Sequence, residues 1–241
     1  MWIMKIDVNL VPTSTEAWGY KNKTIVVIDV LRASSTIITA LEFGARNIVP
    51  VLSPDEAVGL KTRYDSDDVL LGGERGGLKI QGFDLGNSPL EYTKDLVNGK
   101  TIVFTTTNGT KAIRSANGAE TLLISAYINL AATAKKVVEL GNDTLIICAG
   151  RQGSFSLEDA ACAGTLCATI GRLISVEETD SAKATRMIAA SYASPMDVFT
   201  DSEHGQHLLS LGFKEDLEYA ANVNSCETVP FFIGGHLVLE R

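Results

Sequence analysis

The feature that most constrains the fold of this chain is a repeated alternation of short apolar runs with amphipathic stretches. Six runs rich in Val, Ile and Leu occupy residues 24–30, 47–52, 69–71, 101–104, 121–124 and 144–148. Continuous apolar runs of this length are typical of strands that are buried on both faces. Strands alternating with helices predict an α/β fold, with a mainly parallel sheet flanked by helices in three layers.

The stretches between the runs carry helix boundary signals. Ser53, followed by Pro54 and two acids, predicts a helix start, and residues 88–91 have the spacing of a capping box. Gly44, Gly118 and Gly141 each follow an apolar-periodic segment, where a left-handed residue commonly ends a helix.

The two ends of the sequence follow other patterns. Residues 2–10 alternate apolar and polar side chains from Trp2 to Leu10, which predicts an edge strand with one wet face. Residues 181–193, 195–211 and 214–221 have helical patterns. Residues 231–233 and 237–239 flank Gly234 and Gly235, which predicts a closing antiparallel hairpin.

No stretch has the composition of a linker, so we expect one domain over residues 1–241. The segments that begin at Thr24 and Thr101 each lead through a helix to a Gly-Ala pair and another strand. Two related βα halves that arose by duplication would explain this similarity. Two unrelated βα units with the same local sequence preferences would explain it as well.

The chain has 29 acidic and 21 basic residues, a net charge of −8 and no lysine-arginine run. Nucleic acids and anionic membranes are bound through clustered positive charge, so we expect neither as a partner. The first residues lack the plan of a signal peptide or a membrane span, and we expect a cytoplasmic protein. Four cysteines at irregular spacings are expected to be reduced core residues.

In an open parallel sheet, ligands bind beyond the carboxyl ends of the strands, so the loops after the predicted strands are expected to hold the site. Four such loops lie at residues 29–36, 72–77, 105–111 and 150–159. Their candidate site residues are Asp29, Arg32, Ser34, Ser35, Glu74, Arg75, Thr107, Asn108, Gly109, Arg151, Glu158 and Asp159.

Three of these loops combine a carboxylate with an arginine. An acidic protein needs local cations to bind an anion, and the arginine fork matches phosphate or sulfonate. Carboxylates beside these arginines favour a hard cation such as Mg²⁺, which also bridges to phosphate oxygens. The sequence therefore predicts a site for a small polyanionic substrate and Mg²⁺.

Each loop also has a purely structural interpretation. Asp29 could pair with Arg32 or cap the next helix, and the two acids at 158 and 159 could stabilise a helix N-terminus. Asn108 could act only as a helix cap, and residues 72–77 could form a plain turn. Their coincidence at one rim of the sheet favours the functional interpretation.

Other chemistries lack their motifs. The absence of a P-loop and of G-x-G-x-x-G argues against nucleotide chemistry, and no cysteine or histidine has the setting of a phosphatase nucleophile. His204 and His207 could share a helix face and bind a metal, but no third ligand lies nearby and we expect a solvated face.

Several segments resemble those of the 2-phosphosulfolactate phosphatase family. They are VIDVLRASST (27–36), GER (73–75), GNSP (86–89), TTNGT (106–110), CAGR (148–151), ED (158–159), SEHG (202–205) and VP (229–230). The resemblance spans nearly the whole chain. It implies an α/β fold and Mg²⁺-dependent hydrolysis of 2-phospho-3-sulfolactate to 3-sulfolactate and phosphate, a step in coenzyme M biosynthesis.

For such a substrate, we expect Asp29, Glu74 and either Glu158 or Asp159 to hold Mg²⁺, directly or through water. The three loop arginines, at 32, 75 and 151, would bind the anionic groups, with Ser34, Ser35 and the residues at 107–109 donating hydrogen bonds. The attacking group is either a metal-bound water or Asp29 itself, and the sequence does not choose between them.

Two other functions fit the same residues. A related Mg²⁺-dependent hydrolase could act on another small phosphorylated 2-hydroxy acid, because a fold and metal site survive changes of substrate. A non-catalytic protein could instead bind small anions through the arginines alone. The sequence does not fix the oligomeric state, and a homo-oligomer stays open.

Overall fold

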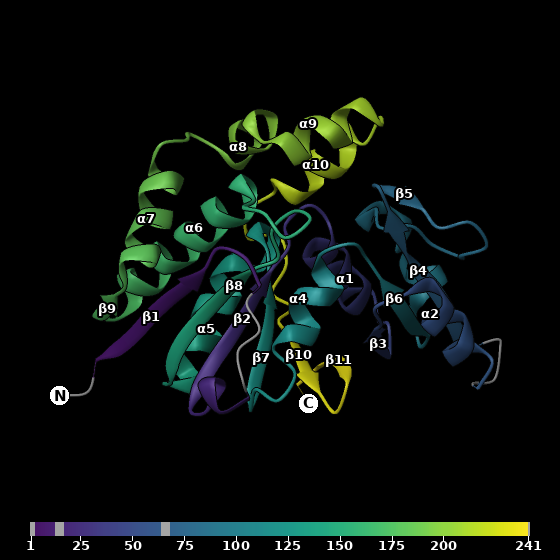
Figure 1. The fold of residues 1–241 in the computed structure, drawn as a ribbon, viewed down its shortest axis with the longest axis horizontal. Coiled ribbons are helices and arrows are strands. Elements are labelled where there is room, and N and C mark those ends of the chain that lie inside the picture. The colour runs from purple at the N-terminus through teal and green to yellow at the C-terminus, as the bar shows by residue number, and fades with distance from the viewer. Residues whose placement is uncertain (1–2, 13–16, 64–67, 241) are drawn as a thin grey trace.

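The computed structural model describes residues 3–12, 17–63 and 68–240, which form a mixed α/β fold (Figure 1). Its strands are β1 (Met4–Asn9), β2 (Lys23–Ile28), β3 (Asn47–Pro50), β4 (Val69–Arg75), β5 (Leu78–Lys79), β6 (Thr101–Thr105), β7 (Thr121–Ser125), β8 (Asp143–Cys148), β9 (Val176–Glu178), β10 (Pro230–Ile233) and β11 (His236–Leu239). These described strands form one sheet in the order β5-β4-β6-β3-β11-β10-β7-β2-β8-β1-β9. All six predicted apolar runs are strands, and the pairs among β1, β2, β3, β4, β6, β7, β8 and β9 are parallel.

The helices are α1 (Ala33–Glu42), α2 (Pro54–Lys61), α3 (Lys94–Val97), α4 (Gly109–Ser115), α5 (Leu130–Leu140), α6 (Leu157–Leu173), α7 (Asp180–Ala190), α8 (Pro195–Asp201), α9 (Glu203–Ser210) and α10 (Lys214–Ala220). Short 3₁₀ helices occupy Ala17–Tyr20, Pro89–Glu91 and Tyr127–Asn129. Within the described ranges no helix has both the length and the apolar character needed to cross a membrane.

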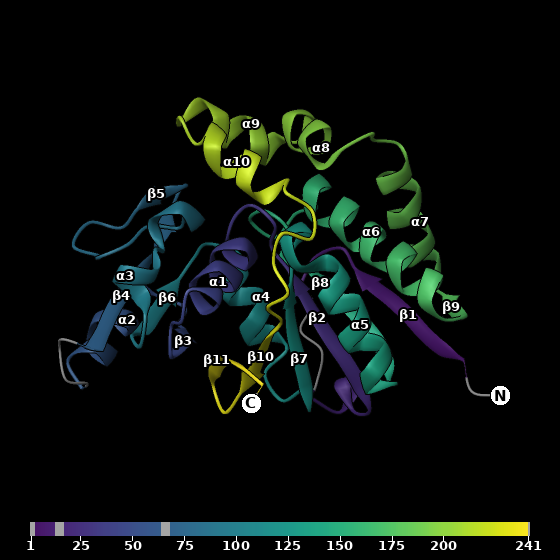
Figure 2. The ribbon, with the colours of Figure 1, turned by 180° about the vertical axis from the view of Figure 1, so that it is seen from behind.

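Helices cover both faces of the sheet because its central strands are apolar on both sides. Along β2, Ile25 and Val27 pack with residues of α1 and α4, whereas Val26 and Ile28 pack with residues of α5 and α6. Two hydrophobic cores therefore lie on opposite faces, and the predicted three layers are present. Figure 2 shows the same arrangement from behind.

The hairpin of β10 and β11 confirms the predicted antiparallel ending, but it lies in the middle of the sheet. Phe231 in β10 pairs with Leu123 in β7, and Leu237 in β11 pairs with Ile48 in β3. The hairpin thus joins two groups of parallel strands (Figure 1). This position depends on contacts between residues far apart in the sequence, which the local pattern does not contain.

The structure corrects some of the local expectations and confirms others. The alternating strand β1 is not at the edge, because the three-residue strand β9 pairs on its outer side; Trp2 lies outside the described residues. Ser53 caps α2 by accepting a hydrogen bond from the backbone N of Glu56. Ser88 forms no capping box and is followed only by a 3₁₀ turn. The helix expected over 195–211 is two helices, α8 and α9. Gly44, Gly118 and Gly141 have positive φ, as predicted.

Candidate functional site

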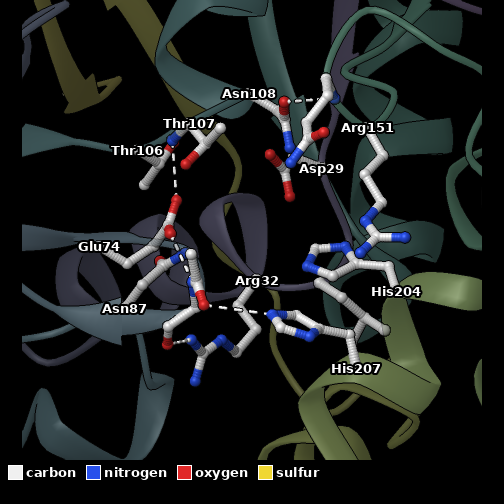
Figure 3. A pocket seen from close by; sticks show the side chains of 14 residues that line it. Asp29, Arg32, Glu74, Asn87, Thr106, Thr107, Asn108, Arg151, His204 and His207 are labelled. Atoms are coloured by element: carbon white, nitrogen blue, oxygen red, sulfur yellow. Dashed lines mark hydrogen bonds between the residues drawn. The ribbon is translucent and has the colours of Figure 1, made fainter.

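A cavity of about 70 Å³ lies where the carboxyl ends of β2, β4, β6 and β8 meet helix α9 (Figure 3). Its lining residues are Asp29, Leu31, Arg32, Glu74, Gly76, Gly77, Asn87, Thr106, Thr107, Asn108, Arg151, Gln152, His204 and His207. Six of the twelve residues predicted from sequence therefore line one cavity, at the edge of the sheet where the sequence predicted the site.

Asp29 follows directly after β2 and is 7% exposed. Its backbone N donates to Ser34 Oγ at 2.9 Å, and its Oδ1 accepts a long hydrogen bond of 3.3 Å from Ala33 N. Burial raises the pKa of Asp29 to about 6, although the nearby His204 lowers it and the charge of Glu74 raises it further. A carboxylate with this pKa exchanges its proton near neutral pH, as catalytic groups often do.

Glu74 is held in place by backbone amides. The predicted loop 72–77 is in fact the end of β4 followed by a tight turn at Gly76 and Gly77 into β5. Oε1 of Glu74 accepts from Thr107 N at 2.7 Å, and Oε2 accepts from Gly77 N at 2.9 Å. These two bonds fix a nearly buried carboxylate against the cavity between β4 and the loop after β6.

The loop after β6 contacts the loop after β8 and the loop after β2. Asn108 Oδ1 accepts from Gln152 N at 2.9 Å, which links this loop to the loop after β8. Gly109 begins α4 beside Asp29, and a Cβ at this position would lie 2.7 Å from Asp29 Oδ2. The glycine therefore lets the helix start pack directly against the carboxylate. It borders the site without lining the cavity.

Two of the three predicted arginines are bound by the protein itself. Arg32 Nη1 lies 2.5 Å from Asp216 Oδ2, its Nη2 donates to Gly77 O, and its guanidinium stacks 4.1 Å from the centre of the Phe213 ring. Both charged groups of the pair are buried. Arg32 lines the cavity, but its guanidinium already has partners within the protein, and the sequence did not predict them.

Arg75 does not line the cavity and is bound by other parts of the protein. It donates to the backbone oxygens of Glu74 and Leu52 at 2.6 and 3.3 Å and to Thr105 Oγ1 at 3.0 Å. It is absent from the cavity lining, so the structure does not bring it together with the other candidate residues.

Arg151 is the predicted arginine with an exposed head at the cavity. It follows β8 in a tight turn in which Gln152 and Gly153 both have positive φ. Its Nη1 lies 3.1 Å from Glu203 Oε2, and the two side chains are 29% and 92% exposed. An exposed pair of this kind contributes about 0–1 kcal/mol, so Arg151 can leave Glu203 for an incoming anion at little cost.

Glu158 and Asp159 lie behind the cavity wall in the first turn of α6. Asp159 accepts from Val30 N at 2.9 Å and from Gly150 N at 3.1 Å, and so joins the loops after β2 and β8. Burial and the charge of Asp29 raise the pKa of Asp159 well above its usual value. Glu158 instead faces a histidine.

Ser34 and Ser35 stabilise the loop that carries Asp29. The Ser34 oxygen accepts from Asp29 N, and Ser35 donates to Val30 O at 2.9 Å. Both are buried and neither lines the cavity.

The expectation of a solvated face for the two histidines of α9 was wrong. His204 and His207 both line the cavity. His204 Nδ1 lies 3.2 Å from Glu158 Oε1, and His207 Nε2 lies 3.2 Å from Gly76 O. Helix patterning gave no signal for this position, but the segment SEHG belongs to the motifs that carried the family resemblance.

The cavity also contains two buried oxygens, Asn87 Oδ1 and Thr107 Oγ1, and both residues line it. Neither oxygen forms a hydrogen bond with any residue in the described ranges. Buried polar atoms of this kind are normally satisfied, so a ligand or water is expected to complete them. Across the ranges that the structure describes, no three His, Cys, Asp or Glu side chains form a preformed metal cluster.

Fold and cavity define an α/β protein whose site gathers carboxylates, an accessible arginine and two histidines at the carboxyl edge of a parallel sheet. Residues 9–235 match the protein family described as "2-phosphosulpholactate phosphatase". A protein of Clostridium acetobutylicum named "Probable 2-phosphosulfolactate phosphatase" is 41% identical, covering 98% of this chain and all of that protein. A protein of Carboxydothermus hydrogenoformans with the same name is 43% identical over 97% of this chain and 94% of its own length. The chain belongs to the 2-phosphosulfolactate phosphatase family.

Proposed function

We propose that this protein is a phosphatase that hydrolyses 2-phospho-3-sulfolactate to 3-sulfolactate and phosphate. The proposal rests on one observation above all: the carboxylate of Asp29, the carboxylate of Glu74 and the guanidinium of Arg151 line one small cavity in a chain of this family. That cavity matches a compact substrate that carries a phosphate ester, a carboxylate and a sulfonate. The reaction would supply coenzyme M biosynthesis.

In this function Arg151 binds an anionic group of the substrate. Its planar fork matches the oxygens of phosphate, sulfonate or carboxylate, and its exposed partner Glu203 competes only weakly for it. Thr107 and Asn87 supply polar atoms that have no hydrogen-bond partner in the part of the chain that the structure describes. Polar groups that are already ordered before the ligand arrives bind it without the free-energy cost of reorganising the protein.

The oxygen donors of the cavity fit Mg²⁺, which prefers carboxylate and neutral oxygens and commonly takes only one or two carboxylates from the protein. We propose Asp29 and Glu74 as these carboxylates, because both line the cavity whereas Glu158 and Asp159 do not. When bound, the ion would neutralise charge on the phosphoryl oxygens and make phosphorus easier to attack. A cytoplasmic location is part of the proposal and fits four free cysteines.

Phosphate release tests this function. The purified protein is incubated with 2-phospho-3-sulfolactate, with phospholactate or with phosphoglycolate, each in Mg²⁺ or in EDTA. We expect the fastest release from phosphosulfolactate, and only with Mg²⁺. A preference for another ester would assign the enzyme to that phosphorylated 2-hydroxy acid. Binding of these anions without release of phosphate from any of them would indicate a non-catalytic anion-binding protein, and equal rates in EDTA would contradict the metal proposal.

The attacking group needs a separate experiment. Either water attacks phosphorus, or Asp29 does so and forms an acyl phosphate that water then hydrolyses. Acid quenching during turnover of a substrate labelled with ³²P decides between them. Label recovered on a peptide containing Asp29 identifies the carboxylate as the nucleophile, whereas unlabelled protein at several quench times favours water.

A further inference from the structure

A histidine that lines the cavity, His204, forms a pair with a buried acid behind the cavity wall, Glu158. Glu158 is 2% exposed, and its Oε1 lies 3.2 Å from His204 Nδ1. Burial raises the pKa of Glu158, but the hydrogen bond and charge of His204, together with hydrogen bonds from the Glu158 backbone and from Ser156, outweigh burial and leave the pKa below its usual value. The pair therefore favours an ionised Glu158 and a proton on Nδ1 of the imidazole.

Both partners are held by helix starts. Ser156 caps α6 by accepting from Asp159 N at 3.3 Å, which fixes the turn that carries Glu158. Ser202 caps α9 by accepting from Gly205 N at 2.9 Å. A Cβ at residue 205 would collide with Phe199 O, so the glycine lets α9 approach α8 closely. These contacts fix the position from which His204 reaches the cavity.

The second ring nitrogen of His204 is available to a ligand. Nε2 makes no hydrogen bond to any residue that the structure describes. Figure 3 shows the ring extending from α9 into the cavity, on the side of Arg151 and across from Asp29. An imidazole whose Nδ1 is held by a carboxylate and whose Nε2 faces a substrate cavity has the arrangement of a general acid-base residue.

We propose that His204 is a catalytic residue that protonates the leaving oxygen of the substrate and that Glu158 is its positioning residue. This inference rests on the proposed phosphatase function. The leaving group of 2-phospho-3-sulfolactate is a secondary alkoxide, which leaves poorly without a proton.

The proposed step balances as follows. The bond between phosphorus and the ester oxygen breaks, and its electron pair stays on that oxygen. The proton on Nε2 of His204 moves to the oxygen, which gives the free hydroxyl of 3-sulfolactate and a neutral imidazole. The phosphoryl group bonds to the attacking oxygen, the water that is consumed releases a proton to solvent, and the imidazole regains a proton from solvent before the next turnover. The overall reaction consumes one water.

The charges around His204 support this role. The Glu158 carboxylate lies against its Nδ1, and the Asp29 carboxylate lines the same cavity. Arg151 and His207 also line this cavity, and Arg151 is partly neutralised by Glu203. The hydrogen-bonded carboxylate is the closest of these groups, so we expect Glu158 to set the pH range in which the donor works.

The test compares the wild type with His204→Gln and with His236→Gln, a matched change in β11 outside the cavity. We expect His204→Gln to lower kcat on phosphosulfolactate by about 10²–10⁴-fold, the usual contribution of a general acid, and His236→Gln to keep it. The decisive readout is the ¹⁸O isotope effect of the bridging ester oxygen on kcat/KM. This effect rises in His204→Gln because the oxygen then leaves without its proton.

Glu158→Gln provides the second readout. Loss of the anion beside the ring favours neutral imidazole, so the alkaline limb of the activity profile is expected to move to lower pH. An unchanged bridging isotope effect in His204→Gln would overturn the role of His204 even if kcat fell. An unchanged pH profile in Glu158→Gln would overturn the role of Glu158. A wild type that releases no phosphate from phosphosulfolactate would overturn the proposed function itself, and the inference with it.

Discussion

Gly109 stands so close to Asp29 that a Cβ on residue 109 would lie 2.7 Å from the carboxylate oxygen Oδ2. The same Cβ would lie 2.5 Å from the Cβ of Ala33 in α1. A movement of the Asp29 side chain alone would therefore not relieve both clashes. We expect Gly109→Ala to lower kcat by about 10²-fold, because a displacement near 1 Å in a reacting group costs that much.

Gly59→Ala is the matched control for this prediction. Gly59 lies within α2, has no atom within 4 Å of its added Cβ and has no positive φ. The change is expected to keep kcat and to stabilise the fold by about 0.5–1 kcal/mol. Steady-state kinetics and urea unfolding measure both effects. A fully active Gly109→Ala enzyme would show that Asp29 tolerates displacement.

Asp29→Asn is expected to abolish turnover and to stabilise the fold at neutral pH. The folded pKa is about 6 against an ordinary value of 3.8, so the folded state binds the proton more tightly. The contribution of Asp29 to stability is then largest below pH 4 and falls as pH rises toward 6, by about 3 kcal/mol in all.

The neutral Asn side chain escapes this penalty. Urea unfolding without divalent ions should therefore show the variant more stable than the wild type at pH 7.5 and nearly equal to it at pH 4. Equal differences at both pH values would contradict the raised pKa of Asp29, whatever the effect on turnover.

Arg32→Ala is expected to destabilise the fold by about 3–5 kcal/mol, because it leaves Asp216 as a buried carboxylate without its partner. Asp216 also accepts from Ser88 Oγ at 2.6 Å, so the pair anchors α10 to the turn before Pro89. Thermal and urea unfolding measure the loss. An Arg32→Ala protein of unchanged stability and raised KM would assign this arginine to substrate binding instead.

Arg151→Ala is expected to have the opposite effect, with little loss of stability and weaker substrate binding. Its ion pair with Glu203 is exposed, so stability is expected to change by less than about 0.5 kcal/mol. Loss of a charge-assisted hydrogen bond to an anion should raise KM by about 10- to 100-fold. Arg46→Ala removes another exposed arginine pair, with Asp68, and is expected to leave KM unchanged. A normal KM in Arg151→Ala would exclude it from substrate binding.

Local patterning predicted the parallel strands and the edge of the sheet at which the cavity lies, because apolar runs and strand ends are properties of neighbouring residues. The same reasoning could not predict the partners of Arg32. Asp216 is 184 residues away, and only the packing of α10 beside the cavity brings it near. The sequence shows an arginine in a loop but not whether its charge is already neutralised.

The position of His204 and His207 also could not be predicted from local patterning. Their spacing predicts one helix face, and an isolated helix would turn two histidines toward solvent. The fold places α9 over the strand ends, so this face meets the cavity. The short strand β9 was missed for a related reason, since three residues carry too little periodicity to be recognised before their partner strand is known.

The central hairpin has a consequence for biosynthesis. Asp29 and Arg151 follow strands on one side of β10 and β11, whereas Glu74 lies in β4 and Thr107 follows β6, both on the other side. A ribosome completes the other described strands before this hairpin, and until then β3 and β7 each expose an unpaired backbone edge. The nascent protein therefore holds the two groups of cavity residues on separate sheets, and the cavity can form only when translation has delivered the segment that joins them.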